Sequence, residues 1–186
     1  MRFRPLISLL IVLCLRSTAS ASSIGVFFSP DATDYEAIIP ANTPATWYIL
    51  AVLGGDAAAG GTTGAEFRQV GTPAGWFMSP AADPAATSIG NPIAGGANIA
   101  FPACRSGGVV LLYTVSGLAT TLVHDHPLSI DRHSTPSNSN FSCPLLVLCD
   151  APVFTTICVS GGYAMINYDN LGVEPASWSS VKGLFD

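Results

Sequence analysis

The stretch TWYILAVL, residues 46–53, decides the fold class of this 186-residue chain. In an extended segment, residues of equal parity share a face, and this segment is apolar on both. A short run that is apolar on both sides is typical of a strand with packed structure on each face, as at the centre of a β-sandwich. We therefore predict that residues 46–53 form a central strand of such a sandwich.

Similar short segments occur on either side, separated by connectors rich in glycine and proline such as GGDAAAGGTTG, TPAGW and GNPIAGGAN. About eight short strands without a long helical pattern indicate an all-β sandwich or barrel. Only the end of the chain differs, because SWSSVKGLF (177–185) has helical spacing and Ser177 can cap a helical turn. Besides 46–53, the predicted strands are 23–28, 64–70, 97–101, 108–117, 126–133, 153–159 and 163–168.

The segment GAEFRQV (64–70) has the pattern of a strand with one wet face. Ala65 and Phe67 alternate with Glu66 and Arg68, and alternation of this kind is typical of a half-buried strand. We therefore expect Ala65 and Phe67 to face the core and Glu66 and Arg68 to face water.

The N-terminus has the pattern of an export signal. Arg2 and Arg4 precede the apolar run LISLLIVLCL, and Ala19-Ser20-Ala21 fits a small-x-small cleavage site. Ten apolar residues are too few for a membrane-spanning helix, which needs about 20. The sequence predicts a signal peptide over residues 1–21, one β-sandwich domain over residues 22–186 and no membrane span after cleavage.

Cleavage would leave an acidic chain. It removes three of the seven basic residues and none of the 12 acidic ones, which gives a net charge of −8. Such a chain offers no basic stripe for phosphates, so nucleic acid is excluded as a predicted partner. About 165 residues that are 10% charged and 49% hydrophobic are enough for one folded core.

Four cysteines remain after processing, namely Cys104, Cys143, Cys149 and Cys158. An even number in an exported chain indicates disulfides, and the wide spacings do not resemble a zinc site. We expect Cys149 to bridge Cys158 locally and Cys104 to bridge Cys143, closing a loop of about 40 residues worth roughly 4 kcal/mol. The main competitor pairs Cys143 with Cys149.

All three histidines lie in TLVHDHPLSIDRHS, residues 121–134. On a strand, His124 and His126 share the apparent core face with Leu122, Leu128 and Ile130, whereas His133 has the opposite parity. Two imidazoles on one face can chelate a metal, but a catalytic ion needs a third ligand that the sequence does not identify. We interpret these histidines as ordinary strand residues, with His124 and His126 as the weak candidates for a metal site.

Other candidates are weaker. The acidic stretch around Asp31 lacks the calcium-loop pattern and reads as a solvated turn, and there is no G-x-S-x-G motif for a hydrolase. The aromatic pair Trp76 and Phe77 follows a turn, where it could stack on a sugar or anchor a partner, although burial is the more common fate of such side chains. Asn140 in NFS fits a glycosylation sequon.

The run from GAEFRQV through GNPIAGGANIAF to GGVVLLYTVSG resembles the strand order of cohesin-like and related immunoglobulin-like modules. PSNSNFSCPLLVLCDAPVFTTICVSGG and SWSSVKGLF are similar to uncharacterised secreted proteins of environmental bacteria. The resemblance implies an immunoglobulin-like or cohesin-like β-sandwich that serves in binding or assembly outside the cell. It assigns no functional residue.

The sequence thus predicts an exported, non-catalytic interaction or structural module without a cofactor, located at the cell surface, in a matrix or in the periplasm. Its predicted partner is an extracellular protein or glycan. One alternative is a carbohydrate-binding module with an exposed aromatic platform that includes Trp76. Another is a metal-binding protein that uses His124 and His126.

Overall fold

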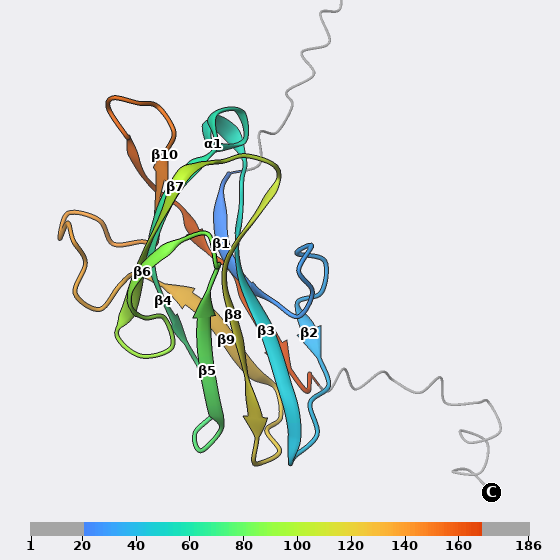
Figure 1. Ribbon diagram of the computed structural model, residues 1–186. Coiled ribbons are helices and arrows are strands. Elements are labelled where there is room, and N and C mark those ends of the chain that lie inside the picture. Colours follow the sequence, from blue (N-terminus) through green and yellow to red (C-terminus); the bar gives the residue numbers. More distant parts are fainter. Residues whose placement is uncertain (1–20, 169–186) are drawn as a thin grey trace, which may run out of the picture.

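The computed structural model describes residues 21–168, which fold into two β-sheets (Figure 1). The predicted signal sequence and the helical turn over 177–185 lie outside the described residues, apart from Ala21. The strands are β1 (Ser23–Phe27), β2 (Glu36–Ala37), β3 (Thr43–Val52), β4 (Thr62–Val70), β5 (Phe77–Ala82), β6 (Thr87–Asn91), β7 (Gly96–Arg105), β8 (Val109–Ala119), β9 (His126–Asp131), β10 (Leu145–Leu148), β11 (Thr156–Cys158), β12 (Ser160–Gly161) and β13 (Tyr163–Ile166).

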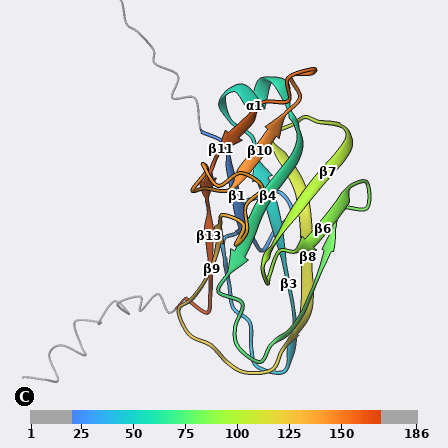
Figure 2. The ribbon, with the colours of Figure 1, turned by 90° about the vertical axis from the view of Figure 1, so that its left-hand side faces the viewer.

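The strands form two sheets that pack face to face. The first has the order β12-β1-β3-β8-β5, and the second has the order β11-β10-β4-β9-β13-β2. In the second sheet, β7 also pairs with β4, and β6 pairs with β7. Figure 2 shows β11, β10, β4, β7 and β6 side by side, with β3 and β8 behind them. The fold is therefore the all-β sandwich that the sequence predicts.

The core between the sheets is built mainly from side chains of the predicted strands. Trp47, the largest fully buried side chain, lies on β3, and its indole N–H donates to Oε1 of buried Gln69 on β4 at 2.8 Å. Phe67 of β4 meets Tyr113 of β8 edge-on, with ring centroids 6.0 Å apart. Residues 49–51 are buried at every position, as expected for a strand covered on both faces. Thr46 is exposed and Tyr48 and Val52 are half-buried, so the stretch 46–53 is covered on both faces only in its middle.

The predicted strands are all present, but some elements were missed or misplaced. The missed strands include β5, which is interrupted by a proline, β6, which is rich in small polar residues, and β10, which is only four residues long. The expected strand 153–159 is reduced to residues 156–158. The glycine-rich connector after β3 contains a short helix, α1 (Gly55–Gly60). No helix within residues 21–168 is long and apolar enough to cross a membrane.

Candidate functional site

The strands β10, β4, β7 and β6 lie side by side in the second sheet (Figure 2). Residues of these four strands line a hollow on the outer face of the sheet. Its first row of side chains follows from the strand register, in which Ile89 lies opposite Asn98, Asn98 opposite Glu66, and Glu66 opposite Leu145. Residues directly opposite each other in antiparallel strands share a face. Because the neighbouring Phe67 points into the core, this row lies on the outer face.

A second row explains why the surface is hollow. Here Thr87 lies opposite Ala100, Ala100 opposite Gly64, and Gly64 opposite Val147, which in turn pairs with Thr156. The middle of the row holds only glycine and alanine, so the larger side chains of the flanking strands stand above it. The result is a hollow of about 310 Å³ with mainly apolar walls, which we call the Glu66 hollow.

Glu66 is the charged residue that lines this hollow. The expectation that it faces water is wrong. Only 5% of the residue is exposed. The loop between β9 and β10 covers it, and the backbone N–H of Ser137 in that loop donates to both carboxylate oxygens, at 3.2 and 3.0 Å. The strand pattern could not reveal this, because the covering loop lies 71 residues further along the chain.

The arginine two residues further along β4 does not neutralise Glu66. Arg68 instead donates to Asp131 on β9, with 2.6 Å between Nη2 and Oδ2. This hydrogen bond is the main cause that lowers the pKa of Asp131 below its ordinary value. Arg68 is 29% exposed at its side chain, so the expectation that it faces water is only partly met. Within residues 21–168, no ion pair reaches Glu66.

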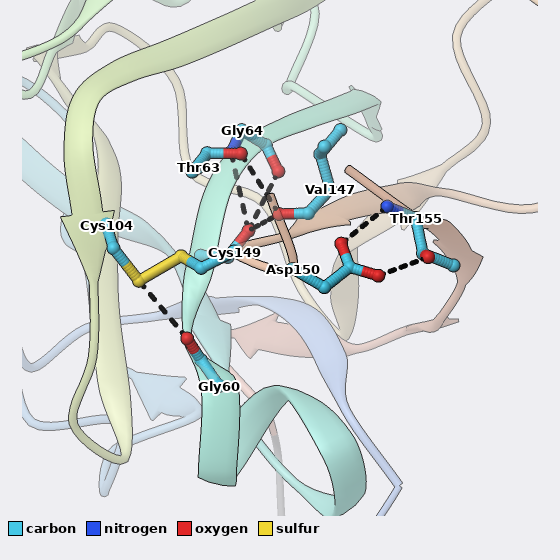
Figure 3. The surroundings of a disulfide bond; sticks show 9 residues. Gly60, Thr63, Gly64, Cys104, Val147, Cys149, Asp150 and Thr155 are labelled. Atoms are coloured by element: carbon cyan, nitrogen blue, oxygen red, sulfur yellow. Dashed lines mark hydrogen bonds between the residues drawn. A yellow bond between two sulfur atoms is a disulfide. The ribbon is translucent and has the colours of Figure 1, made fainter. Parts of the chain in front are cut away.

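The four cysteines within residues 21–168 form two disulfides, as expected, but the expected pairing is wrong. Cys104 bridges Cys149, and Cys143 bridges Cys158. The register explains the first bridge, since the ends of β7 and β10 both pair with the start of β4, at Thr62. Figure 3 shows this bridge beside Gly60, whose carbonyl oxygen lies 3.1 Å from the Cys104 sulfur. The bridge therefore joins β7 to the end of β10 across β4 at one end of the sheet.

The loop that follows Cys149 is held by its own side chains. The carboxylate of Asp150 accepts hydrogen bonds from the backbone N–H of Thr155 at 2.7 Å and from its hydroxyl group (Figure 3). These bonds, that of the hydroxyl first, lower the pKa of Asp150. The loop presents Val153 and Phe154 to solvent.

The three histidines do not share one strand. His124 lies on a bend, and β9 begins only at His126, after Asp125 with φ 45°. Nε2 of His126 donates to the carbonyl oxygen of Gly71 at 2.5 Å, so this nitrogen is not open to a metal ion here. Within residues 21–168, no three His, Cys, Asp or Glu side chains come together as a metal-binding group.

The parity argument for the predicted strand holds from His126 onwards. Leu128 and Ile130 are buried in the core, as expected. The expectation of the core face is wrong for Leu122, which precedes the bend and is 53% exposed, and for His124, which is exposed on the bend.

The aromatic pair after β4 is split between core and surface. Trp76 is only 7% exposed, and its indole N–H donates to the carbonyl oxygen of Thr121 at 2.9 Å. Phe77 is 73% exposed on β5. A flat sugar platform that includes Trp76 is therefore not formed, which removes the main feature expected of a carbohydrate-binding module.

The acidic stretch near the N-terminus forms a self-contained turn. Oδ1 of Asp31 accepts hydrogen bonds from the backbone N–H and the hydroxyl group of Thr33. Hydrogen bonds from Ser29 and Thr33 lower the pKa of Asp31. Asn140 of the sequon is exposed on the loop between β9 and β10.

No family model and no curated protein matches the chain. Solved cohesin structures resemble it loosely. The sixth cohesin of scaffoldin B from Acetivibrio cellulolyticus, solved with a dockerin, is 8% identical over 81% of this chain and 100% of its own, with a TM-score of 0.48. A non-cellulosomal cohesin from Archaeoglobus fulgidus is 12% identical over 79% and 91%, with a TM-score of 0.44. A type III cohesin from a cell-surface anchoring scaffoldin of Ruminococcus flavefaciens is 12% identical over 82% and 89%, with a TM-score of 0.43.

Proposed function

We propose that the chain is an exported, non-catalytic binding module whose mature domain begins at Ser22 and recognises a protein partner through the Glu66 hollow. The observation that carries the proposal is the hollow itself, since the outer face of a sandwich sheet is usually covered by polar side chains facing water. Apolar walls around a few fixed polar groups are the usual chemistry of a binding site. The two disulfides support an oxidising compartment at the cell surface, in a matrix or in the periplasm.

The binding surface can be tested by filling the hollow. Ala100 is exposed at its centre, so Ala100→Trp blocks the hollow without entering the core. Ala81→Trp on the exposed side of β5 is the matched control, because it adds the same side chain to the other sheet. Peptides selected from a random display library on the oxidised protein should bind the control and lose at least tenfold in affinity for Ala100→Trp.

A glycan array with the same proteins separates the protein partner from a sugar. Glycan binding that Ala100→Trp abolishes, without any selectable peptide, would replace the protein partner by a carbohydrate. Equal peptide binding by both tryptophan variants would show that the hollow is not the binding surface. Export is tested by expressing the full chain and measuring its intact mass, which should correspond to a protein that starts at Ser22.

A further inference from the structure

The carboxylate of Glu66 has spare hydrogen-bonding capacity directed at the hollow. An ionised carboxylate offers about four acceptor sites, and the Ser137 N–H is its one hydrogen-bond donor among the described residues. Burying a charge is costly unless the charge is paired and hydrogen-bonded. At 5% exposure, Glu66 therefore lines the hollow with a carboxylate that has no ion-pair partner among the described residues.

No described cation of the chain supplies the missing positive charge. Arg68 and Arg105 form the two ion pairs found among the described residues, each with an aspartate. The third described arginine, Arg132, donates to the carbonyl oxygen of Phe141 at 3.5 Å. None of the arginines within residues 21–168 therefore forms an ion pair with Glu66.

We propose that the Glu66 hollow receives the side chain of a lysine on the partner protein, an inference that rests on the proposed function. The aliphatic stem of the lysine lies against Ile89, Leu145 and Val147, and its ammonium group reaches the carboxylate of Glu66. Asn98, directly opposite Glu66 in the register, offers a second oxygen to the ammonium. Long basic side chains bury their stems on apolar surface in this way.

The carboxylate favours lysine over arginine. A guanidinium group binds a carboxylate best as a fork that uses both oxygens. Both oxygens of Glu66 already accept the Ser137 N–H, whereas an ammonium group is a compact charge that needs only one free acceptor direction. The hollow, at about 310 Å³, is at the small end of ligand sites, which suits a single side chain better than an oligosaccharide.

The test is an NMR titration of the oxidised, isotope-labelled protein with four small probes at neutral pH. These are N-acetyl-lysine N-methylamide, its arginine counterpart, butylammonium chloride and n-butanol. The lysine amide and butylammonium should shift the amide resonances of residues 63–66 and 98–100, with dissociation constants on the order of millimolar for such small ligands. The butanol of equal length should produce no such shifts.

Glu66→Gln keeps the size of the side chain and an acceptor for Ser137, and it should weaken binding of the lysine amide at least tenfold. Glu36→Gln, an exposed change on β2 of the same sheet, is the matched control and should bind like the wild type. Equal shifts by butanol and butylammonium in the wild type would overturn the proposal without any variant. Unchanged binding by Glu66→Gln, or tighter binding of the arginine amide, would overturn it as well.

Two further outcomes separate this inference from the proposed function. Binding of butylammonium without the lysine amide would make the hollow a site for a free amine and would refute a lysine on a partner. Binding of the lysine amide in the hollow, together with peptide binding that survives Ala100→Trp, would preserve the lysine site and refute only the proposed recognition surface.

Discussion

Replacing Asn167 should destabilise the fold far more than its place near the end of the described chain suggests. Its side chain accepts a hydrogen bond from the backbone N–H of Ile39 at 2.6 Å and donates to the carbonyl oxygens of Ile39 and Val123, at 3.0 and 2.8 Å. It therefore joins the segments that precede β3 and β9 to the end of β13. The residue is buried and has φ 50°, a conformation that asparagine tolerates better than most residues.

The magnitude follows from these three bonds. A hydrogen bond contributes about 1 kcal/mol net, and a buried partner left without a bond costs about 1–3 kcal/mol. Ile39 is 6% exposed and would lose partners for both its N–H and its C=O. Asn167→Gly removes the side chain while still tolerating the positive φ, so we expect a loss of about 3–5 kcal/mol. Asn167→Ala should cost about 1 kcal/mol more, because alanine is strained at this φ.

The assay is equilibrium urea unfolding with the disulfides intact, followed by the fluorescence of the buried Trp47 and Trp76. With a slope of about 2 kcal/mol per molar urea, Asn167→Gly should lower the midpoint by about 2 M. Asn140→Gly, at an exposed loop position, is the control and should shift it by less than about 0.5 M. A loss of less than about 1 kcal/mol for Asn167→Gly would refute the hydrogen-bond argument.

Two further predictions concern the cross-links and acid stability. Serine substitution of the Cys104–Cys149 pair, with a sequence separation of 45, should cost about 4 kcal/mol, against about 3 kcal/mol for the Cys143–Cys158 pair with a separation of 15. Peptide mapping without reduction should recover these two pairs, and a Cys149–Cys158 peptide would contradict the structure. The hydrogen bond from Arg68 lowers the pKa of Asp131 in the folded state. The ionised carboxylate of Asp131 therefore stabilises the fold above about pH 4, and this stabilisation is lost as the pH falls through the pKa of Asp131 in the folded state. In urea unfolding, Asp131→Asn should therefore lose less free energy of unfolding than the wild type as the pH falls, and the difference should be less than about 1 kcal/mol because the ion pair is partly exposed. The same dependence on pH for the variant and the wild type would refute this.

The sequence was informative wherever burial follows a period along one segment. The long strands β3 and β8 are recognisable because each contains a short, nearly continuous apolar run, and a glycine-rich connector follows β3. In contrast, β5 contains Pro80 and alternates exposed and half-buried residues, and β6 is rich in small polar residues. These strands are held by pairing with β8 and β7, a constraint that is absent from their own sequences.

The site depends on contacts between segments that are distant in the sequence, and these were the contacts that the sequence could not provide. The cysteine pairing follows from β4 lying between β7 and β10, because this order brings Cys104 towards Cys149. The two-residue period places Glu66 on the outer face correctly. It does not show that Ser137 lies above the carboxylate or that Ala100 leaves space beside it.

The burial of Glu66 is hard to explain by stability alone. A glutamate on an outer sheet face can stay in water at no cost, whereas here the residue is only 5% exposed and gains one N–H and no ion pair within the described chain. Replacing a buried charge with an uncharged group of similar volume is often neutral or stabilising. A residue that costs stability in this way is explained if it contributes to binding, since binding sites commonly trade stability for function. Glu66→Gln should therefore fold at least as well as the wild type while it loses affinity for lysine, a combination that a purely structural role for Glu66 does not produce.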